Sequence, residues 1–174
     1  RESLRVPALA IPITMIGGLA LGLVAGYYGG TVETLIMRVV DILLAFPSIL
    51  LVLSIVAALG PGLTTVLIAL AISHIPAYSR IVRSLVLTVK NLDYVTAARA
   101  VGASNLRIMV NHILPNILPP LIVYNTIMVG GMIYITAGLS YIGLGAQPPS
   151  PEWGAMLSYG RVYLREAWWM SVFP

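Results

Sequence analysis

Few side chains in this sequence have the types and spacing that chemistry requires. His74 and His112 are its only histidines and there is no cysteine, so thiolate metal sites and disulfides are excluded. Neither histidine has a second metal ligand at helical spacing. No phosphate-binding G-x4-G-K-[ST] loop occurs, and no Ser/His/Asp arrangement can be argued. The sequence therefore predicts no catalytic residue, no metal site and no cofactor.

One acidic residue, Asp41, lies near the start of a long apolar stretch. Acids inside membrane segments are candidates for function because their burial in lipid is costly. Arg38 precedes Asp41 by three residues, which is a helical neighbour distance. We therefore expect a local Arg38–Asp41 ion pair at the membrane edge.

Three glycines, Gly18, Gly22 and Gly26, recur at every fourth position of the first apolar stretch. This spacing places them on one helix face, where the backbone of another helix can approach closely. Glycine is also simply frequent in membrane helices, which is the alternative explanation. We expect a packing face whose partner helix the sequence does not identify.

A polar, basic segment contains signals for two short helices separated by a sharp turn. Asp93 is placed to cap the first helix and Gly102 to end it, while Ser104 can cap a second helix over Asn105–Leu114, before Pro115. The first helix carries the small residues Ala97, Ala98 and Ala100. Such a helix can enter a groove on another protein, with Arg99 and Arg107 pairing with acidic rims, or it can be an ordinary surface loop.

The elements that must position these residues are helices in lipid. Hydrophobic residues make up 59% of the 174 residues and charged residues 9%, against roughly 25% in soluble domains. The mean hydropathy is +0.94. Because a membrane-spanning helix needs about 20 apolar residues, we predict spans at 8–28, 39–59, 63–78 and 117–142, and a truncated one from Ala167. Pro47 and Pro76 should bend their helices, as static kinks or as hinges.

The distribution of charge predicts the orientation of these spans. Residues 79–112 carry five Lys and Arg against Asp93 alone, whereas residues 145–166 are balanced. Because cytoplasmic loops are enriched in Lys and Arg, the first segment is expected inside and the second outside. The basic residues flank apolar spans, so the net charge of +4 does not indicate a nucleic-acid partner. The absence of an initial Met and the apolar end led us to expect a piece of a longer protein.

Several motifs together carry a resemblance to a known family. Thr96-Ala97-Ala98, Gly102 and Leu114-Pro115 match the spacing of the ABC importer permease motif E-A-A-x3-G-x9-I-x-L-P, with Thr96 in place of Glu and His112 in place of Ile. Residues 41–48, 99–116, 139–145, 147–149 and 153–156 also resemble the dipeptide/oligopeptide/nickel branch. The chain is thus similar to permease subunits of binding-protein-dependent ABC importers.

This resemblance implies an all-α, polytopic transmembrane bundle of the type I ABC importer kind, in the inner (plasma) membrane. Residues 1–174 would form one partial permease domain that lacks the first helix and most of the last. The implied partners are the lipid bilayer, a second permease that is identical or similar, cytoplasmic ATP-binding subunits and an extracytoplasmic substrate-binding protein. The implied cargo is peptides or related small solutes, including nickel. The ATP would be hydrolysed by a partner subunit.

Two segments would contact partners by this resemblance. A cytoplasmic loop at about 79–115 would couple to the ATPase through Tyr94, Thr96, Ala97, Ala98, Arg99, Gly102, Ala103, Leu114 and Pro115. An extracytoplasmic loop at about 145–166 contains three prolines that fix its shape. It would dock the binding protein or close the outer mouth through Gln147, Pro148, Pro149, Glu152 and Trp153, or would be a rigid connector.

Two other classes of function remain open on the residues alone. A secondary transporter or channel would work without ATP and would need buried acids, of which only Asp41 is available. A scaffolding membrane protein would need no cytoplasmic helical segment. The short helices around Gly102 favour a permease that is driven by a separate motor subunit.

Overall fold

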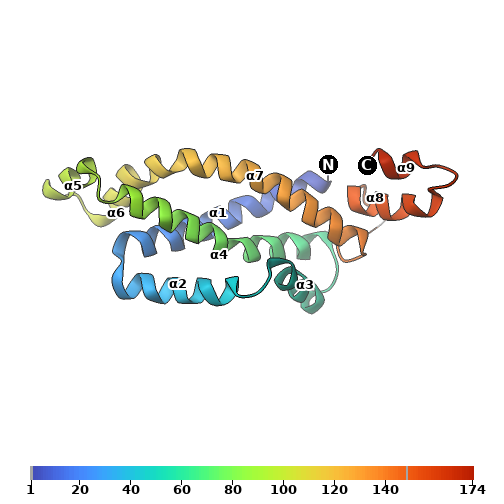
Figure 1. Cartoon of the computed structure of the whole chain (residues 1–174), viewed down its shortest axis with the longest axis horizontal. Helices are drawn as coiled ribbons and strands as arrows, with labels where there is room; N and C mark the ends of the chain where they lie inside the picture. Colours follow the sequence, from blue (N-terminus) through green and yellow to red (C-terminus); the bar gives the residue numbers. More distant parts are fainter. Residues whose placement is uncertain (1, 148) are drawn as a thin grey trace. The chain divides into compact units, whose positions relative to one another are not determined.

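The computed structural model describes residues 2–147 and 149–174, and every regular element in these residues is helical (Figure 1). The long helices are α1 (Glu2–Tyr28), α4 (Leu63–Val89) and α7 (Leu114–Tyr141). Helix α6 (Asn105–Ile108) and a π-helical turn, η1 (Met109–Ile113), lead directly into α7. The prediction of an all-α chain is confirmed.

Three helices in the described chain are long and apolar enough to cross a membrane. They are Glu2–Tyr28, Leu63–Val89 and the continuous Asn105–Tyr141. The remaining elements are α2 (Gly30–Leu44), α3 (Ser48–Leu59), α5 (Asp93–Ala100), α8 (Trp153–Gly160), η2 (Arg161–Tyr163) and α9 (Trp169–Val172).

The second predicted span, residues 39–59, is broken rather than continuous. Helix α2 starts at Gly30 and ends at Leu44, and α3 begins at Ser48. Pro47 precedes α3 in an extended conformation, with ψ at 128°. Proline lacks an amide donor and disfavours a helical residue before it, so the break falls where these two effects coincide. The two helices together are apolar enough to count as one broken span.

Proline has a milder effect in the other long helices. The third span, predicted over residues 63–78, continues as a helix to Val89 and contains Pro76 without ending. The expectation that the helix from Asn105 would stop before Pro115 is wrong, because α7 starts at Leu114 and runs through Pro115. The π-helical turn immediately before α7 departs from the i→i−4 hydrogen-bond pattern. Pro115 has no amide donor, and it therefore lies where the regular α-helical pattern is already interrupted.

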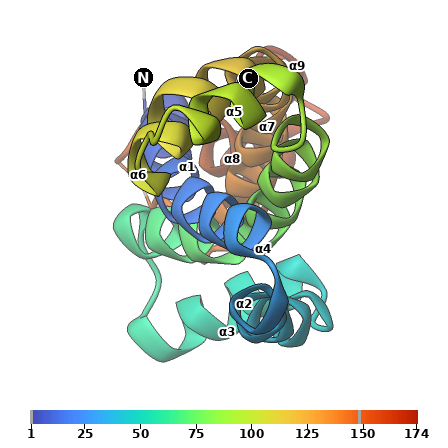
Figure 2. The same ribbon diagram turned by 90° about the vertical axis from the view of Figure 1, so that its left-hand side faces the viewer.

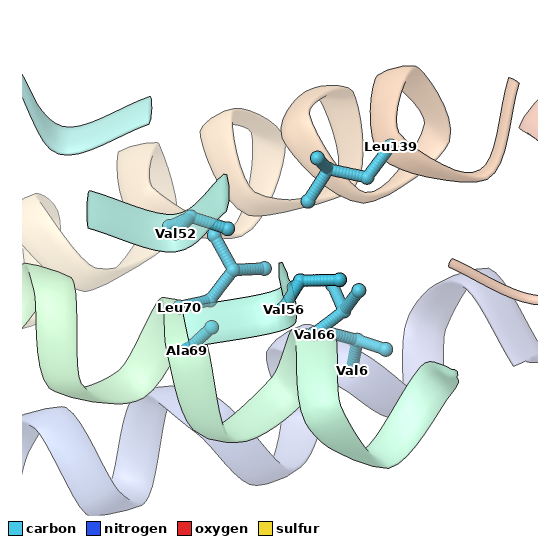
Figure 3. Close-up of a cluster of buried hydrophobic side chains, with 7 residues drawn as sticks. All are labelled: Val6, Val52, Val56, Val66, Ala69, Leu70 and Leu139. Atoms are coloured by element: carbon cyan, nitrogen blue, oxygen red, sulfur yellow. The ribbon is translucent and has the colours of Figure 1, made fainter. Parts of the chain in front are cut away.

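The described chain divides into two compact units, and α1, α4 and α7 contribute segments to both. The first unit comprises Arg1–Ile13, Pro47–Ser73 and Ile127–Pro174. Its core is a cluster of small aliphatic side chains from four helices (Figure 3): Val6, Val52, Val56, Val66, Ala69, Leu70 and Leu139. Each of them is at most 2% exposed, so the cluster joins α1, α3, α4 and α7 within this unit.

The second unit comprises Thr14–Phe46 and His74–Thr126. Tyr78 of α4 lies against Tyr124 of α7, with ring centroids 5.8 Å apart. The side chain of Asn125 in α7 donates to the sulfur of Met15 in α1 at 3.2 Å. These contacts join α1, α4 and α7, and Figure 2 shows α5 and α6 at the end of this unit that faces the viewer.

Candidate coupling segment

The glycine face of α1 lies against α4 in the second unit. A Cβ added to Gly18 would stand 2.6 Å from Cδ1 of Tyr78, and one added to Gly26 would stand 2.8 Å from Cβ of Val86. A Cβ on Gly22 would overlap the main-chain oxygen of Ser79. Since real Cβ atoms do not approach so closely, only glycine permits this separation of the two helices.

A fourth glycine, Gly17, also belongs to this contact, although it lies outside the regular spacing. A Cβ there would stand 2.9 Å from Cδ1 of Ile75. Gly17 was not predicted to belong to the packing face, because it falls outside the repeat of every fourth residue. The adjacent Gly17-Gly18 pair was the available signal.

The basic residues near the end of α4 hold neighbouring helices. Arg80 forms an ion pair with Asp41 of α2. Arg83 donates through Nε to Oε1 of Glu33 in α2 at 2.6 Å. Lys90 Nζ donates to the main-chain oxygen of Gly26 at 2.8 Å. This places a positive charge at the C-terminal end of α1, where the helix dipole favours a cation.

The predicted Arg38–Asp41 pair is wrong. Asp41 pairs with Arg80, which is 39 residues away in the sequence, and Arg38 has no ionic partner among residues 2–147 and 149–174. Packing of α2 beside α4 brings the longer-range partner to the carboxylate. A rule based on helical neighbours cannot anticipate such a pair.

The first short helix, α5, begins one residue earlier than the sequence predicts, because Asp93 was expected to be its N-cap. Leu92 occupies the N-cap position, in an extended conformation, and Asp93 is the first helical residue. Asp93 makes no capping hydrogen bond, but its charge still suits the first turn of a helix. Ser104 caps α6 as predicted, since its Oγ accepts from the amide of Arg107 at 3.4 Å.

The turn after α5 depends on Gly102, whose φ is +81°. The amide of Gly102 donates to the oxygen of Arg99 at 3.0 Å, and that of Ala103 to the oxygen of Ala98 at 3.1 Å. This pair of hydrogen bonds is the Schellman arrangement that closes many helices, with a left-handed residue after the cap. A side chain with a Cβ would be strained at that φ.

The two faces of α5 differ in burial. Val95 and Ala98 are buried within the chain, with 0% and 8% exposed. Tyr94, Thr96, Ala97 and Arg99 are exposed. Thr96, at the position of the motif's Glu, donates its hydroxyl to the oxygen of Leu92 at 3.3 Å. The outward face therefore has little bulk at Ala97.

Two exposed apolar residues near Gly102 were missed by the sequence analysis. Val101 is 85% exposed and Leu106 is 68% exposed. Their signal was available, because large apolar side chains are unusual in a short polar loop. Leu114 and Pro115 start α7 rather than belonging to the loop, and Leu114 is half-buried.

A hydrogen bond ties this segment to the end of α1. The hydroxyl of Tyr27 donates to Oδ1 of Asn105 at 2.8 Å. With the Lys90–Gly26 bond, it fixes the chain before α5 and the chain after α5 to the same last turn of α1. The short helix is thus held at both of its ends by the glycine-packed helix pair.

The predicted docking loop in the first unit has a buried acid. Glu152 is fully buried and caps α8: Ala155 donates its amide to Oε2 at 3.1 Å, and Ser3 donates its hydroxyl to Oε1 at 3.3 Å. Its carboxylate therefore cannot reach a partner, and Glu152 positions α8 instead. Trp153 is 41% exposed, and Gln147 donates its side-chain amide to Gly143 at 2.7 Å. Pro149 is exposed, and Pro148 lies outside the described residues.

No group of three or more His, Asp or Glu side chains that could hold a metal occurs in the described part of the chain. His74 and His112 lie in α4 and η1. Around α5, the structure brings together the small residue Ala97, the apolar Val101 and the basic Arg99 and Arg107, all exposed.

The chain matches a known protein family over most of its length. The profile of the family described as "Binding-protein-dependent transport system inner membrane component" matches residues 18–173. The chain is 49% identical, over all 174 residues, to the dipeptide transport system permease protein DppC of Alkalihalophilus pseudofirmus, and spans 57% of that protein. It is 48% identical to the di/tripeptide transport system permease protein DppC of Pseudomonas aeruginosa, again over 174 residues and 57% of that protein.

Among solved structures, an inward-facing form of the MetNI methionine ABC transporter matches with a TM-score of 0.75 and 22% identity. The match covers 96% of this chain and 79% of the other. At that identity the likeness shows the fold alone, which is that of a type I ABC importer permease. The profile and the two relatives establish more, and the chain belongs to the family of binding-protein-dependent transport system inner membrane components.

Proposed function

We propose that this chain forms part of the membrane path of an ATP-driven importer for short peptides. The observation that carries the proposal is its identity of 49% and 48% to two permeases whose names specify dipeptides and di/tripeptides. A further relative, at 43% identity, is a glutathione transport system permease of Pectobacterium atrosepticum, and glutathione is itself a small peptide. We do not extend the proposal to nickel.

The proposed partners are a binding protein on the outer side, ATP-binding subunits on the cytoplasmic side and a second permease. The family description supports the first of these, because it names binding-protein-dependent transport. ATP hydrolysis would belong to the partner subunits, since this sequence has no phosphate-binding loop.

In this proposal, the loop at 79–115 transmits motion through α5. The outward face of α5 presents Tyr94, Ala97 and Val101, at helical spacings, for insertion into a groove of an ATP-binding subunit. Arg99 and Arg107 are exposed beside it and can pair with acids on the groove's rim. The tight turn at Gly102 and the anchors at Tyr27 and Lys90 make the segment stiff enough to transmit displacement.

The outer loop at 145–166 is proposed to contact the binding protein through Gln147, Pro149 and Trp153. An exposed tryptophan beside restrained prolines suits a docking surface, because little conformational entropy is lost on binding. Glu152 supports that surface from inside by capping α8.

The runner-up, an ion-coupled secondary transporter, is less well supported. Such a protein needs an acid that is free to bind a coupling ion. Asp41, the only candidate identified in the sequence, is paired with Arg80.

The deciding experiment uses the full-length permease with its partner subunits in sealed vesicles. We expect accumulation of a labelled dipeptide that requires both ATP on the cytoplasmic side and the binding protein outside. A non-hydrolysable ATP analogue should abolish this accumulation. Uptake that follows an ion gradient without ATP would contradict the proposal and favour the secondary transporter.

A further inference from the structure

A charged cavity in the second unit takes no part in the proposed coupling or docking. It has a volume of about 460 Å³ and lies between α2 and α4. Its charged lining consists of Glu33, Arg38, Asp41, Arg80 and Arg83. Three cations against two anions leave the lining with one excess positive charge.

The hydrogen bonds within this cavity leave specific atoms available. Nε and Nη2 of Arg83 both donate to the same oxygen of Glu33, Oε1. Arg80 donates through Nη2 to Oδ1 of Asp41. Arg38 is exposed and has no ionic partner in the described chain. The cavity thus offers a free guanidinium and a free carboxylate oxygen, Oδ2 of Asp41.

The two ion pairs also differ in how firmly they are held. The side chains of Arg80 and Asp41 are 54% and 59% exposed, whereas those of Arg83 and Glu33 are 31% and 22% exposed. An exposed pair contributes little stability and exchanges readily. A ligand's cation can therefore approach Asp41 beside Arg80, while the ligand's anion is bound by Arg38.

The outer side of α2 is apolar and uncovered. Leu35, Val39 and Ile42 are 63%, 60% and 59% exposed, and in helical projection they form one strip that adjoins the strip of Glu33, Arg38 and Asp41. A helix with one charged and one apolar side is typical of the boundary between headgroups and acyl chains. A lipid molecule can therefore place its headgroup in the cavity and its chains beside α2.

We propose that this cavity binds the headgroup of an ethanolamine phospholipid, with the phosphate on Arg38 and the ammonium on Asp41. Guanidinium groups bind phosphate through strong, charge-assisted hydrogen bonds. The ammonium supplies the N–H donors that a free carboxylate oxygen accepts. A choline headgroup has no such donors and a glycerol headgroup has no cation, so the cavity distinguishes among the three. This inference is independent of the cargo and of the coupling proposed above.

The chemistry of an ammonium joined to an oxyanion is shared by short peptides, so the test must separate the two sources. The full-length permease complex is equilibrated with vesicles holding equal parts of ethanolamine, choline and glycerol phospholipids. Retained lipids are then counted by native mass spectrometry. We expect preferential retention of the ethanolamine lipid, and no displacement of it by an added dipeptide. Displacement by the dipeptide would assign the cavity to peptides and overturn the lipid proposal.

Two variants test the two halves of the contact. Arg38→Gln should reduce ethanolamine lipid retention by about tenfold or more, the effect of losing one charge-assisted hydrogen bond, and it leaves the Arg80–Asp41 and Arg83–Glu33 ion pairs in place. Asp41→Asn should shift the preference toward glycerol phospholipid, because it removes the negative charge that attracts the ammonium and frees Arg80 for phosphate. Arg165→Gln, at an exposed arginine outside the cavity, is the matched control and should change neither. Unchanged retention in Arg38→Gln, or equal retention of all three lipids by the wild type, would overturn the proposal.

Discussion

Ala97 and Ala98 are neighbours in the sequence but lie on different faces of α5, one exposed and one buried. Ala98 is 8% exposed and packs within this chain, whereas Ala97 is exposed. Alanine therefore has a different structural role at each of these two positions. The small side chain of Ala98 lets α5 pack closely against the rest of this chain. The small side chain of Ala97 leaves the exposed face of α5 without a bulky group at that position.

This difference predicts opposite behaviour for two tryptophan variants. Ala97→Trp should leave the permease folded but weaken its retention of the ATP-binding subunit by about tenfold, because overpacking a tight contact costs about 1–3 kcal/mol. Ala98→Trp should instead destabilise the permease itself, since its bulk would enter a buried contact. Co-purification and thermal unfolding separate the two effects. Ala97→Ser is the control, and normal subunit retention by Ala97→Trp would contradict the coupling proposal.

The sequence predicts the long helices well and their lateral partners poorly. Apolar runs of sufficient length mark α1, α4 and α7, because the bilayer imposes that length on any helix that crosses it. The break at Pro47 was taken for a kink because the apolar run continues through it. The partner of Asp41 was missed because Arg80 meets it only through packing of α2 on α4.

In the candidate site too, features that depend on the local sequence could be predicted, and features that depend on tertiary packing could not. Gly102 and Ser104 were identified because turns and caps depend on the local sequence. The burial of Glu152 was not foreseen, because it depends on Ser3 at the other end of the chain. Residue type alone suggested a surface acid.

The contact between α1 and α4 predicts a strong effect of adding a single methyl group. Gly22→Ala should destabilise the permease by about 1–3 kcal/mol, because the new Cβ would overlap the main-chain oxygen of Ser79. Gly130→Ala is the matched control, since a Cβ there meets nothing within 4 Å. Thermal unfolding in detergent compares the two. Equal stability of both variants would show that α1 and α4 do not pack in this way.

The orientation of the chain is predicted by its charges. A cysteine at Asn91, just before α5, should react with an impermeant thiol reagent only from the cytoplasmic side. A cysteine at Ser150 should react only from outside. These 174 residues contain no cysteine, so the introduced thiol is the only one among them. The reverse labelling pattern would invert the topology and remove α5 from the ATPase.

The outer loop gives a prediction that separates contact from support. Trp153→Ala should weaken binding-protein affinity while leaving the permease stable, because the side chain is substantially exposed. Glu152→Gln should lower stability, since it removes the charge that caps α8 and leaves a buried network incomplete. Affinity is measured with the purified binding protein, and stability by thermal unfolding. If Trp153→Ala leaves both affinity and transport unchanged, the loop is only a connector.

The turn at Gly102 offers the sharpest test of the coupling segment, because the residue type at this position is restricted by the backbone conformation alone. A Cβ at Gly102 would meet nothing within 4 Å, so any effect of substitution must come from the φ of +81°. A β-branched residue is disfavoured in that region by about 1–2 kcal/mol or more, whereas asparagine tolerates it. Gly102→Val should therefore lower subunit retention and peptide uptake together, and Gly102→Asn should preserve most of both. Membrane insertion should be normal in each, as the turn lies between α5 and α6. Equal uptake by the two variants, at equal protein levels, would show that the turn does not set the position of α5 for coupling.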